Sequence, residues 1–307
     1  MSMDALVTFI EDQLAQELYS YVLLDPLAVS KDSDQSILQQ LDSILDENAF
    51  SRVYRQDIAH APQSHPILVC LATPGTPPNK FLLEITAHAA LGDIRRRRRY
   101  VCGWLFSEAC PSDIAHHLTS ICRIPSGPCT TAFYPIFEPV RFELFATSFG
   151  DTEKGPWWPV KHWLFLTSSG TPARVNGHPI PRCPIPDHTL DMQREAVLVA
   201  TLLGAHRALL ERPSTTPLPA IPPAPAKHSY HQIQQARALG LSTDDDILAL
   251  VLRQTCLHPA LHTHPTVRAQ IDVAATQQRP LAQIFAQYTD ADWKHLIATL
   301  PRSEAPA

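Results

Sequence analysis

A proline-rich segment divides the 307-residue chain into two parts with different sequence patterns. The segment PSTTPLPAIPPAPA, residues 213–226, holds six of the 29 prolines and has neither charge nor apolar periodicity. Proline lacks a backbone N–H and fixes φ, so such a run favours extended polyproline II over helix or sheet. We therefore predict a semi-rigid linker over 212–227, spanning at most about 40 Å, between two domains.

Before the linker, apolar strand-like runs alternate with amphipathic helical patterns. The spacing predicts helices over 4–16, 36–45, 81–91, 112–124 (capped by Ser112), 138–149 (with Pro139 at its first position) and 190–210. Strands are predicted over 18–28, 50–54, 65–72, 100–106 and 131–137, with a hairpin over 159–177 turned at Ser169-Gly170. This alternation favours an α/β domain with a mixed sheet over residues 1–211.

Beyond the linker, only helical patterns remain. One helix is expected to end at Gly240, which suits the left-handed position after a helix. The next begins after Ser242 or Thr243, with aspartates 244–246 in its first turn, where negative charge is favourable. Further apolar spacings continue to residue 300. We predict a small all-helical domain over 228–307.

Composition and charge restrict the function classes. The chain is 45% hydrophobic and 18% charged, which suits a sizeable core, and its net charge of −5 argues against a dedicated nucleic-acid binder. It has no apolar stretch of membrane-spanning length and no signal-peptide pattern, so we expect a cytoplasmic protein without membrane insertion. Its seven cysteines are an odd number without a C-x-x-C pair, which is typical of reduced thiols.

The histidines give no convincing metal site. His258, His262 and His264 lie close together in HPALHTHP, but Pro259 and Pro265 interrupt any helix that would align them. We interpret them as surface loop residues. The pair His116-His117 could accompany a cysteine, but no third, orienting group is visible. No metal or cofactor is expected.

Five consecutive arginines, Arg95, Arg96, Arg97, Arg98 and Arg99, form the sharpest charge feature. They fall between a predicted helix and a predicted buried strand, where a connection must cross the surface. We expect all five to be exposed. They could bind a protein partner, bind nucleic acid, or only interact favourably with the negative C-terminal end of the preceding helix.

The sequence contains no nucleophile elbow, phosphate loop, dinucleotide fingerprint or H-E-x-x-H motif. The tryptophans in GPWWPVKHW are assigned by their surroundings. Trp163 lies in a predicted strand and should pack in the core. Trp157 and Trp158 follow a proline and precede another, so we consider them for a partly exposed partner surface.

The order of several motifs resembles the type VI secretion effector chaperones, also called effector adaptors. These motifs are LYSYVLLDPLA, AHAPQSHPILVCLA, YVCGWLFSEACPSDIAHHL, AFYPIFEPVRFELF, GPWWPVKHWLFLTSSG, ARALGLSTDDDILALVL and DADWKHLI. Where the family tends to show Asp-Pro-Arg, this chain has Glu138-Pro139-Val140 followed by Arg141, so a charged pair could survive with shifted geometry. The proline linker and the arginine run cannot be attributed to the family.

The resemblance implies a non-catalytic protein that binds a cognate toxin effector and helps to load it onto the secretion spike protein. Its partners would be that effector and the spike, with no nucleic acid. The candidate contact residues are Arg95–Arg99, Trp157, Trp158, Glu138 and Arg141. Two alternatives stay open: an enzyme with an unrecognised active site, and a nucleic-acid-binding module that uses the arginine run.

Overall fold

The computed structural model describes residues 2–28, 37–179, 184–211, 221–222 and 224–301. The chain folds into two compact units, 1–196 and 197–307. The division between them falls inside the long helix α6 (His188–Leu210), whereas the sequence suggests a boundary at 211. Most of the predicted linker, 212–220 and residue 223, lies outside the described residues, and its last residues, 225–227, already belong to helix α7.

The first unit is built around an antiparallel sheet. The strands are β1 (Tyr19–Leu24), β2 (Phe50–Arg52), β3 (Ile67–Ala72), β4 (Val101–Ser107), β7 (His162–Leu166) and β8 (Pro172–Asn176). Among the described residues these form one sheet in the order β2-β3-β1-β4-β7-β8. The predicted α/β part followed by helices is confirmed. The sheet is antiparallel at every described pairing rather than mixed, because β3 and β4, which run in the same direction, are separated by β1.

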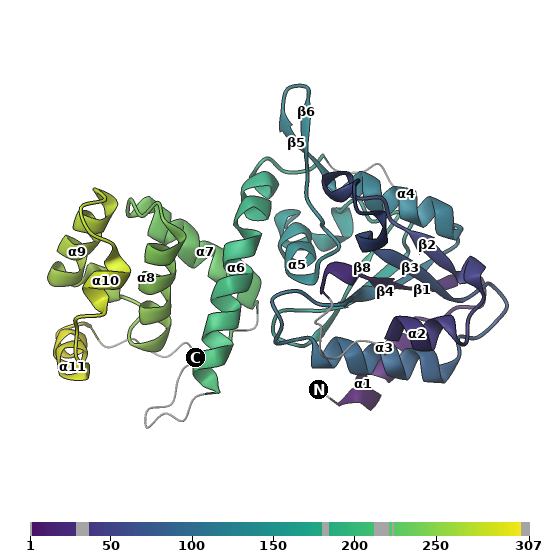
Figure 1. Cartoon of the computed structure of the whole chain (residues 1–307), viewed down its shortest axis with the longest axis horizontal. Coiled ribbons are helices and arrows are strands. Elements are labelled where there is room, and N and C mark those ends of the chain that lie inside the picture. The colour runs from purple at the N-terminus through teal and green to yellow at the C-terminus, as the bar shows by residue number, and fades with distance from the viewer. Residues whose placement is uncertain (1, 29–36, 180–183, 212–220, 223, 302–307) are drawn as a thin grey trace. The chain divides into compact units, whose positions relative to one another are not determined.

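Helices cover both faces of this sheet (Figure 1). On one face lie α1 (Met3–Glu11), α2 (Ile37–Asp42) and α3 (Lys80–Gly92), and on the other lie α4 (Pro111–Ile121) and α5 (Pro139–Ser148). Alternate side chains of each strand enter the two cores: Tyr21 and Leu23 of β1 pack towards α4 and α5, whereas Val22 and Leu24 pack towards α1 and α3. The sheet therefore separates two apolar cores.

Several local predictions are confirmed and some are wrong. Pro139 begins α5, and β7 and β8 form the expected hairpin. The cap of α4 is Cys110 rather than Ser112, because Pro111 already occupies the first helical position. The expected strand 131–137 is instead the second half of a small hairpin, β5 (Arg123–Gly127) with β6 (Thr130–Phe133), because Pro135 cannot continue a ladder.

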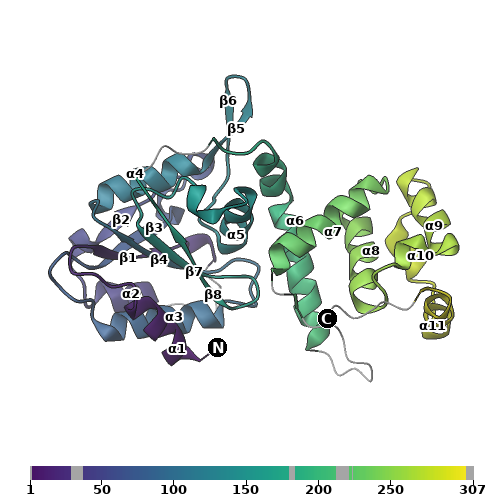
Figure 2. The same cartoon turned by 180° about the vertical axis from the view of Figure 1, so that it is seen from behind.

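The second unit contains helices only in its described part, as Figure 2 shows. Besides the end of α6, they are α7 (Pro225–Ala238), α8 (Asp244–Cys256), α9 (Pro265–Ala275), α10 (Leu281–Phe285) and α11 (Asp290–Ala298). Gly240 has a φ of +94°, the left-handed conformation predicted after α7. Thr243 caps α8 by accepting from the backbone N–H of Asp246 at 3.3 Å. The core includes Leu250, Ile271 and Phe285.

Candidate functional site

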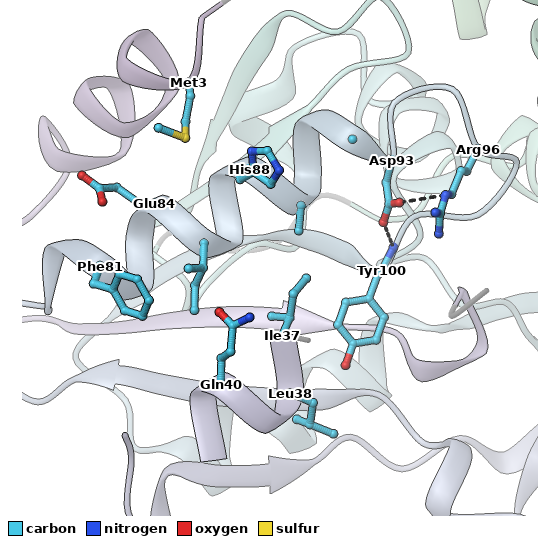
Figure 3. Close-up of a pocket in the computed structure, with 13 residues that line it drawn as sticks. Met3, Ile37, Leu38, Gln40, Phe81, Glu84, His88, Asp93, Arg96 and Tyr100 are labelled. Atoms are coloured by element: carbon cyan, nitrogen blue, oxygen red, sulfur yellow. Dashed lines mark hydrogen bonds and ion pairs between the residues drawn. The ribbon is translucent and has the colours of Figure 1, made fainter. Parts of the chain in front are cut away.

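A groove of about 640 Å³ runs along the outward face of α3 (Figure 3). Met3 of α1 lines one side of it, and Ile37, Leu38 and Gln40 of α2 line the other. The sequence gives this arrangement no local signal, because it requires three helices that are distant in the chain to pack on one face of the sheet. We call this feature the α3 groove.

The floor of the α3 groove carries an apolar row. Phe81, Ile85 and Ala89 are four residues apart, so they follow one stripe of α3. Phe81 is 49% exposed, which is unusual for a large aromatic side chain with a flat apolar surface. Glu84 and His88 form a neighbouring polar row in the same groove. The floor is thus an open apolar stripe with titratable groups beside it.

Asp93, at the end of α3, holds the connection between α3 and β4, which lines one end of the groove. Its buried carboxylate accepts from the backbone N–H of Tyr100 at 2.9 Å and pairs with Nε of Arg96 at 3.1 Å (Figure 3). Residues 94–99, which we call the arginine loop, are therefore held at both ends. Sequence reasoning missed Asp93, although its place next to the arginine run is a visible signal.

The arginine loop sends its side chains in different directions. Arg95, Arg96, Arg97 and Arg98 are exposed, as predicted. The prediction for Arg99 is wrong: its side chain is buried, and its guanidinium donates to the carbonyl oxygens of Leu166 at 2.6 Å and Thr167 at 3.2 Å. Arg99 thereby provides hydrogen-bond donors for the backbone carbonyl oxygens at the end of β7. Four arginines of the run, not five, face solvent.

Glu138 and Arg141 form the charged pair that the sequence suggested. Nε of Arg141 lies 3.1 Å from Oε2 of Glu138, across the first turn of α5. Arg141 also donates to the backbone carbonyl of Gln193 at 2.7 Å and lies over the ring of Tyr134. Arg98 of the arginine loop reaches the other carboxylate oxygen of Glu138 at 3.7 Å. The pair therefore connects α5 to α6 and to the loop, chiefly as a structural contact.

The two candidate tryptophans differ. Trp157 is fully buried among Phe142, Phe145 and Phe149, and its indole N–H donates to the carbonyl of Thr152, so its assignment to a partner surface is wrong. The flanking prolines do not keep it at the surface, because aromatic side chains of α5 enclose it. Trp158 is half-buried and stays a candidate contact residue.

A buried group of charges, which the sequence did not indicate, surrounds Asp25. Burial, followed by the negative charge of Glu138, raises the pKa of Asp25 to about 6, although the Leu27 N–H, Arg55 and Arg98 oppose this. Arg55 is also buried and forms two hydrogen bonds with the carboxylate of Asp57. One oxygen of Asp25 and one nitrogen of Arg55 have no hydrogen-bond partner among the described residues.

The histidines and aspartates of the second unit have structural roles. His258 is buried rather than exposed, and its Nδ1 accepts from the N–H of Ala260, while His264 caps α9. His262 bonds to Gln254 at 2.7 Å. Asp246, in the first turn of α8, accepts from the backbone N–H of Leu281, the first residue of α10, at 2.7 Å. It therefore connects the starts of these two helices. Within the described ranges, no group of three or more His, Cys, Asp or Glu side chains is arranged to hold a metal.

Burial disfavours the thiolate form of several cysteines. It raises the pKa of Cys122 to about 12 and raises the pKa of Cys102 as well. Six cysteines are free thiols, and Cys183 lies outside the described residues.

The histidine pair of α4 is divided between surface and core: His116 is exposed, while its neighbour His117 is buried.

Comparison with protein-family models, with curated proteins and with solved structures finds no match to this chain. The resemblance to effector adaptors therefore rests on the motif order alone. No helix in the described part of the chain combines the length and apolarity needed to cross a membrane.

Proposed function

We propose that this chain is a non-catalytic chaperone or adaptor that acts in the cytoplasm, binds a cognate toxin effector and helps to load it onto the spike protein of a type VI secretion system. The observation that carries the proposal is the α3 groove, an open apolar surface that ends at exposed arginines. Apolar burial supplies affinity, and clustered charge speeds encounter and selects the partner. The motif order supplies the class of partner.

One observation favours an enzyme as the alternative. The pKa of Asp25, about 6, lies in the range where a carboxyl group serves well as a general acid or base, and Glu138 and Arg55 act on it. However, the side chain of Asp25 has no exposed surface, and it does not line the α3 groove. A substrate in that groove would not reach it. We therefore place the adaptor first.

The proposal is tested by co-expressing the tagged chain with each protein encoded by its neighbouring genes. We expect one toxin to form a stoichiometric complex with it, and secretion of that toxin to fail when the gene of this chain is deleted. An Asp25→Asn variant should restore secretion fully, because Asp25 has no catalytic role in an adaptor. Absence of any complex with toxin or spike would refute the proposal, and a folded Asp25→Asn protein that cannot restore secretion would favour the enzyme.

A further inference from the structure

We infer that the α3 groove receives an amphipathic helix with carboxylates at the end beside the arginine loop. The inference rests on the proposed function, because it specifies which part of a protein partner this chain would hold. Backbone hydrogen bonding, length and charge each favour a helical occupant of this kind.

Backbone hydrogen bonding selects a helix over an extended segment. The floor and both walls of the groove are helices, α3, α1 and α2, whose backbone groups already bond within each helix (Figure 3). An extended segment in this apolar groove would leave its own N–H and C=O groups without partners, which is costly. A helix satisfies its backbone internally and can offer apolar side chains. An extended partner would instead pair with an edge strand of the sheet, β2 or β8.

The dimensions suit a short helix. The floor follows α3, whose 13 residues extend about 20 Å. A partner helix of about four turns would cover that length. The spacing of Phe81, Ile85 and Ala89 matches a facing helix with apolar residues one turn apart. Phe81 is the anchor of this contact because it combines the largest side chain of the row with 49% exposure.

Charge determines which end of the partner carries acidic residues. Arg96 and Asp93 line the groove at the end of α3 and pair with each other, and Arg98 reaches Glu138. The arginine loop nevertheless exposes four cations, Arg95–Arg98, against these two acids, so this end carries an excess of positive charge. Arginine binds carboxylates with paired hydrogen bonds while its stem covers apolar surface. At the opposite end of the apolar row, Glu84 provides negative charge. An acidic end at the arginine loop is therefore favoured, and a basic end there is disfavoured.

The test uses a synthetic probe, so its result does not depend on identifying the effector. The probe is a fluorescent peptide of about four helical turns, with leucines along one face and glutamates in one terminal turn. Two further peptides replace the glutamates by lysines or place a proline at the centre. Binding is followed by fluorescence anisotropy, and helix formation by circular dichroism. We expect the acidic peptide to bind and gain helicity, the basic one to bind about tenfold more weakly, and the proline one not to bind.

Variants of the full chain locate the binding surface. Phe81→Ala should weaken binding of the acidic peptide about tenfold or more. Val197→Ala is the matched control, because Val197 is 45% exposed but lies outside the groove, and it should leave binding unchanged. Equal binding of all three peptides, or equal affinity of Phe81→Ala and the unchanged protein, would overturn the inference. So would a concentration-dependent dimer that Phe81→Ala abolishes, because a second copy would then occupy the groove.

The two proposals can fail separately. If a toxin co-purifies but Phe81→Ala binds it normally and the peptides do not discriminate, the groove inference fails and the adaptor function stands. If the peptides discriminate as expected but no toxin or spike binds, the adaptor function fails while the groove remains a helix-binding site.

Discussion

The guanidinium of Arg99 lies 2.6 Å from the carbonyl oxygen of Leu166, 67 residues further along the chain. Its neighbours in the run, Arg95–Arg98, face solvent. Identical residues in one run therefore have different roles, and substitutions within it should have different consequences.

Replacing Arg99 should destabilise the fold, whereas replacing Arg97 should not. Arg99→Ser leaves the carbonyl oxygens of Leu166 and Thr167 without their charged donor, at a cost of about 2–3 kcal/mol in the free energy of unfolding. Arg97 is exposed, so Arg97→Ser should change stability by less than about 0.5 kcal/mol. Urea denaturation of both variants measures the difference. Similar midpoints for the two would show that the buried contact contributes little.

The exposed arginines should control the rate of partner capture. Replacing Arg95, Arg96 and Arg97 by serine should slow association with the effector about tenfold at low salt. It should cost little stability, because Asp93 loses its ion pair with the partly exposed Arg96 but still accepts from the backbone N–H of Tyr100. The difference should shrink as added salt screens the charges. Stopped-flow or surface-binding measurements across a salt series provide the rates.

The matched control changes the same amount of charge elsewhere. Arg123, Lys154 and Arg194 are exposed cations outside the arginine loop, and replacing all three by serine should slow association much less. If both triple variants are slowed equally, net charge rather than the position of the loop controls association.

Because of Asp25, we expect the free energy of unfolding to fall as pH rises from about 4 to about 6. Its pKa is raised from 3.8 to about 6 in the folded protein, so in this window the folded state holds a proton that the unfolded state has released. The stabilisation from this proton is present at low pH and is lost as pH passes through 6. Asp25→Asn keeps the acceptor for Leu27 without the charge, so relative to the unchanged protein it should gain up to about 3 kcal/mol between pH 4 and pH 7.

Asp57 provides a control of opposite sign. Burial opposes the shift, but its hydrogen bond and attraction to Arg55 lower the pKa of Asp57 overall, so its contribution to stability is present at neutral pH and lost on acidification. Asp57→Asn should therefore destabilise the protein at pH 7 and converge with it in acid. Unfolding curves at several pH values measure both variants. A pH-independent difference for Asp25→Asn would contradict the assignment.

The histidines of the second unit should contribute to stability rather than bind metal. His264 caps α9 and His258 accepts a backbone N–H, so replacing both by alanine should cost about 1 kcal/mol for each lost contact. The burial of His258 corrects the expectation that these are surface loop residues. Thermal unfolding with added zinc, and with a chelator, should give the same midpoint for the unchanged protein. A zinc-dependent rise that the double variant loses would reverse this interpretation.

The sequence by itself determined the elements whose causes are local. Short apolar runs marked β1 and β3, Pro139 marked the start of α5, and Gly240 marked the end of α7. These features depend on runs of apolar side chains, on the missing N–H of proline and on the conformational freedom of glycine, all of which operate within a few residues. The order of an α/β part followed by helices follows from the same patterns.

Only the tertiary structure decided which side chains are buried and which meet. Arg99 and Arg97 are chemically identical, and only the end of β7 distinguishes them by offering carbonyl oxygens to one. Trp157 is enclosed by α5, although its prolines suggested exposure. Asp25 and Glu138 influence each other across more than a hundred residues, and the α3 groove needs α1, α2 and α3 on one face. Such contacts depend on how distant segments pack, and local sequence patterns do not predict that packing.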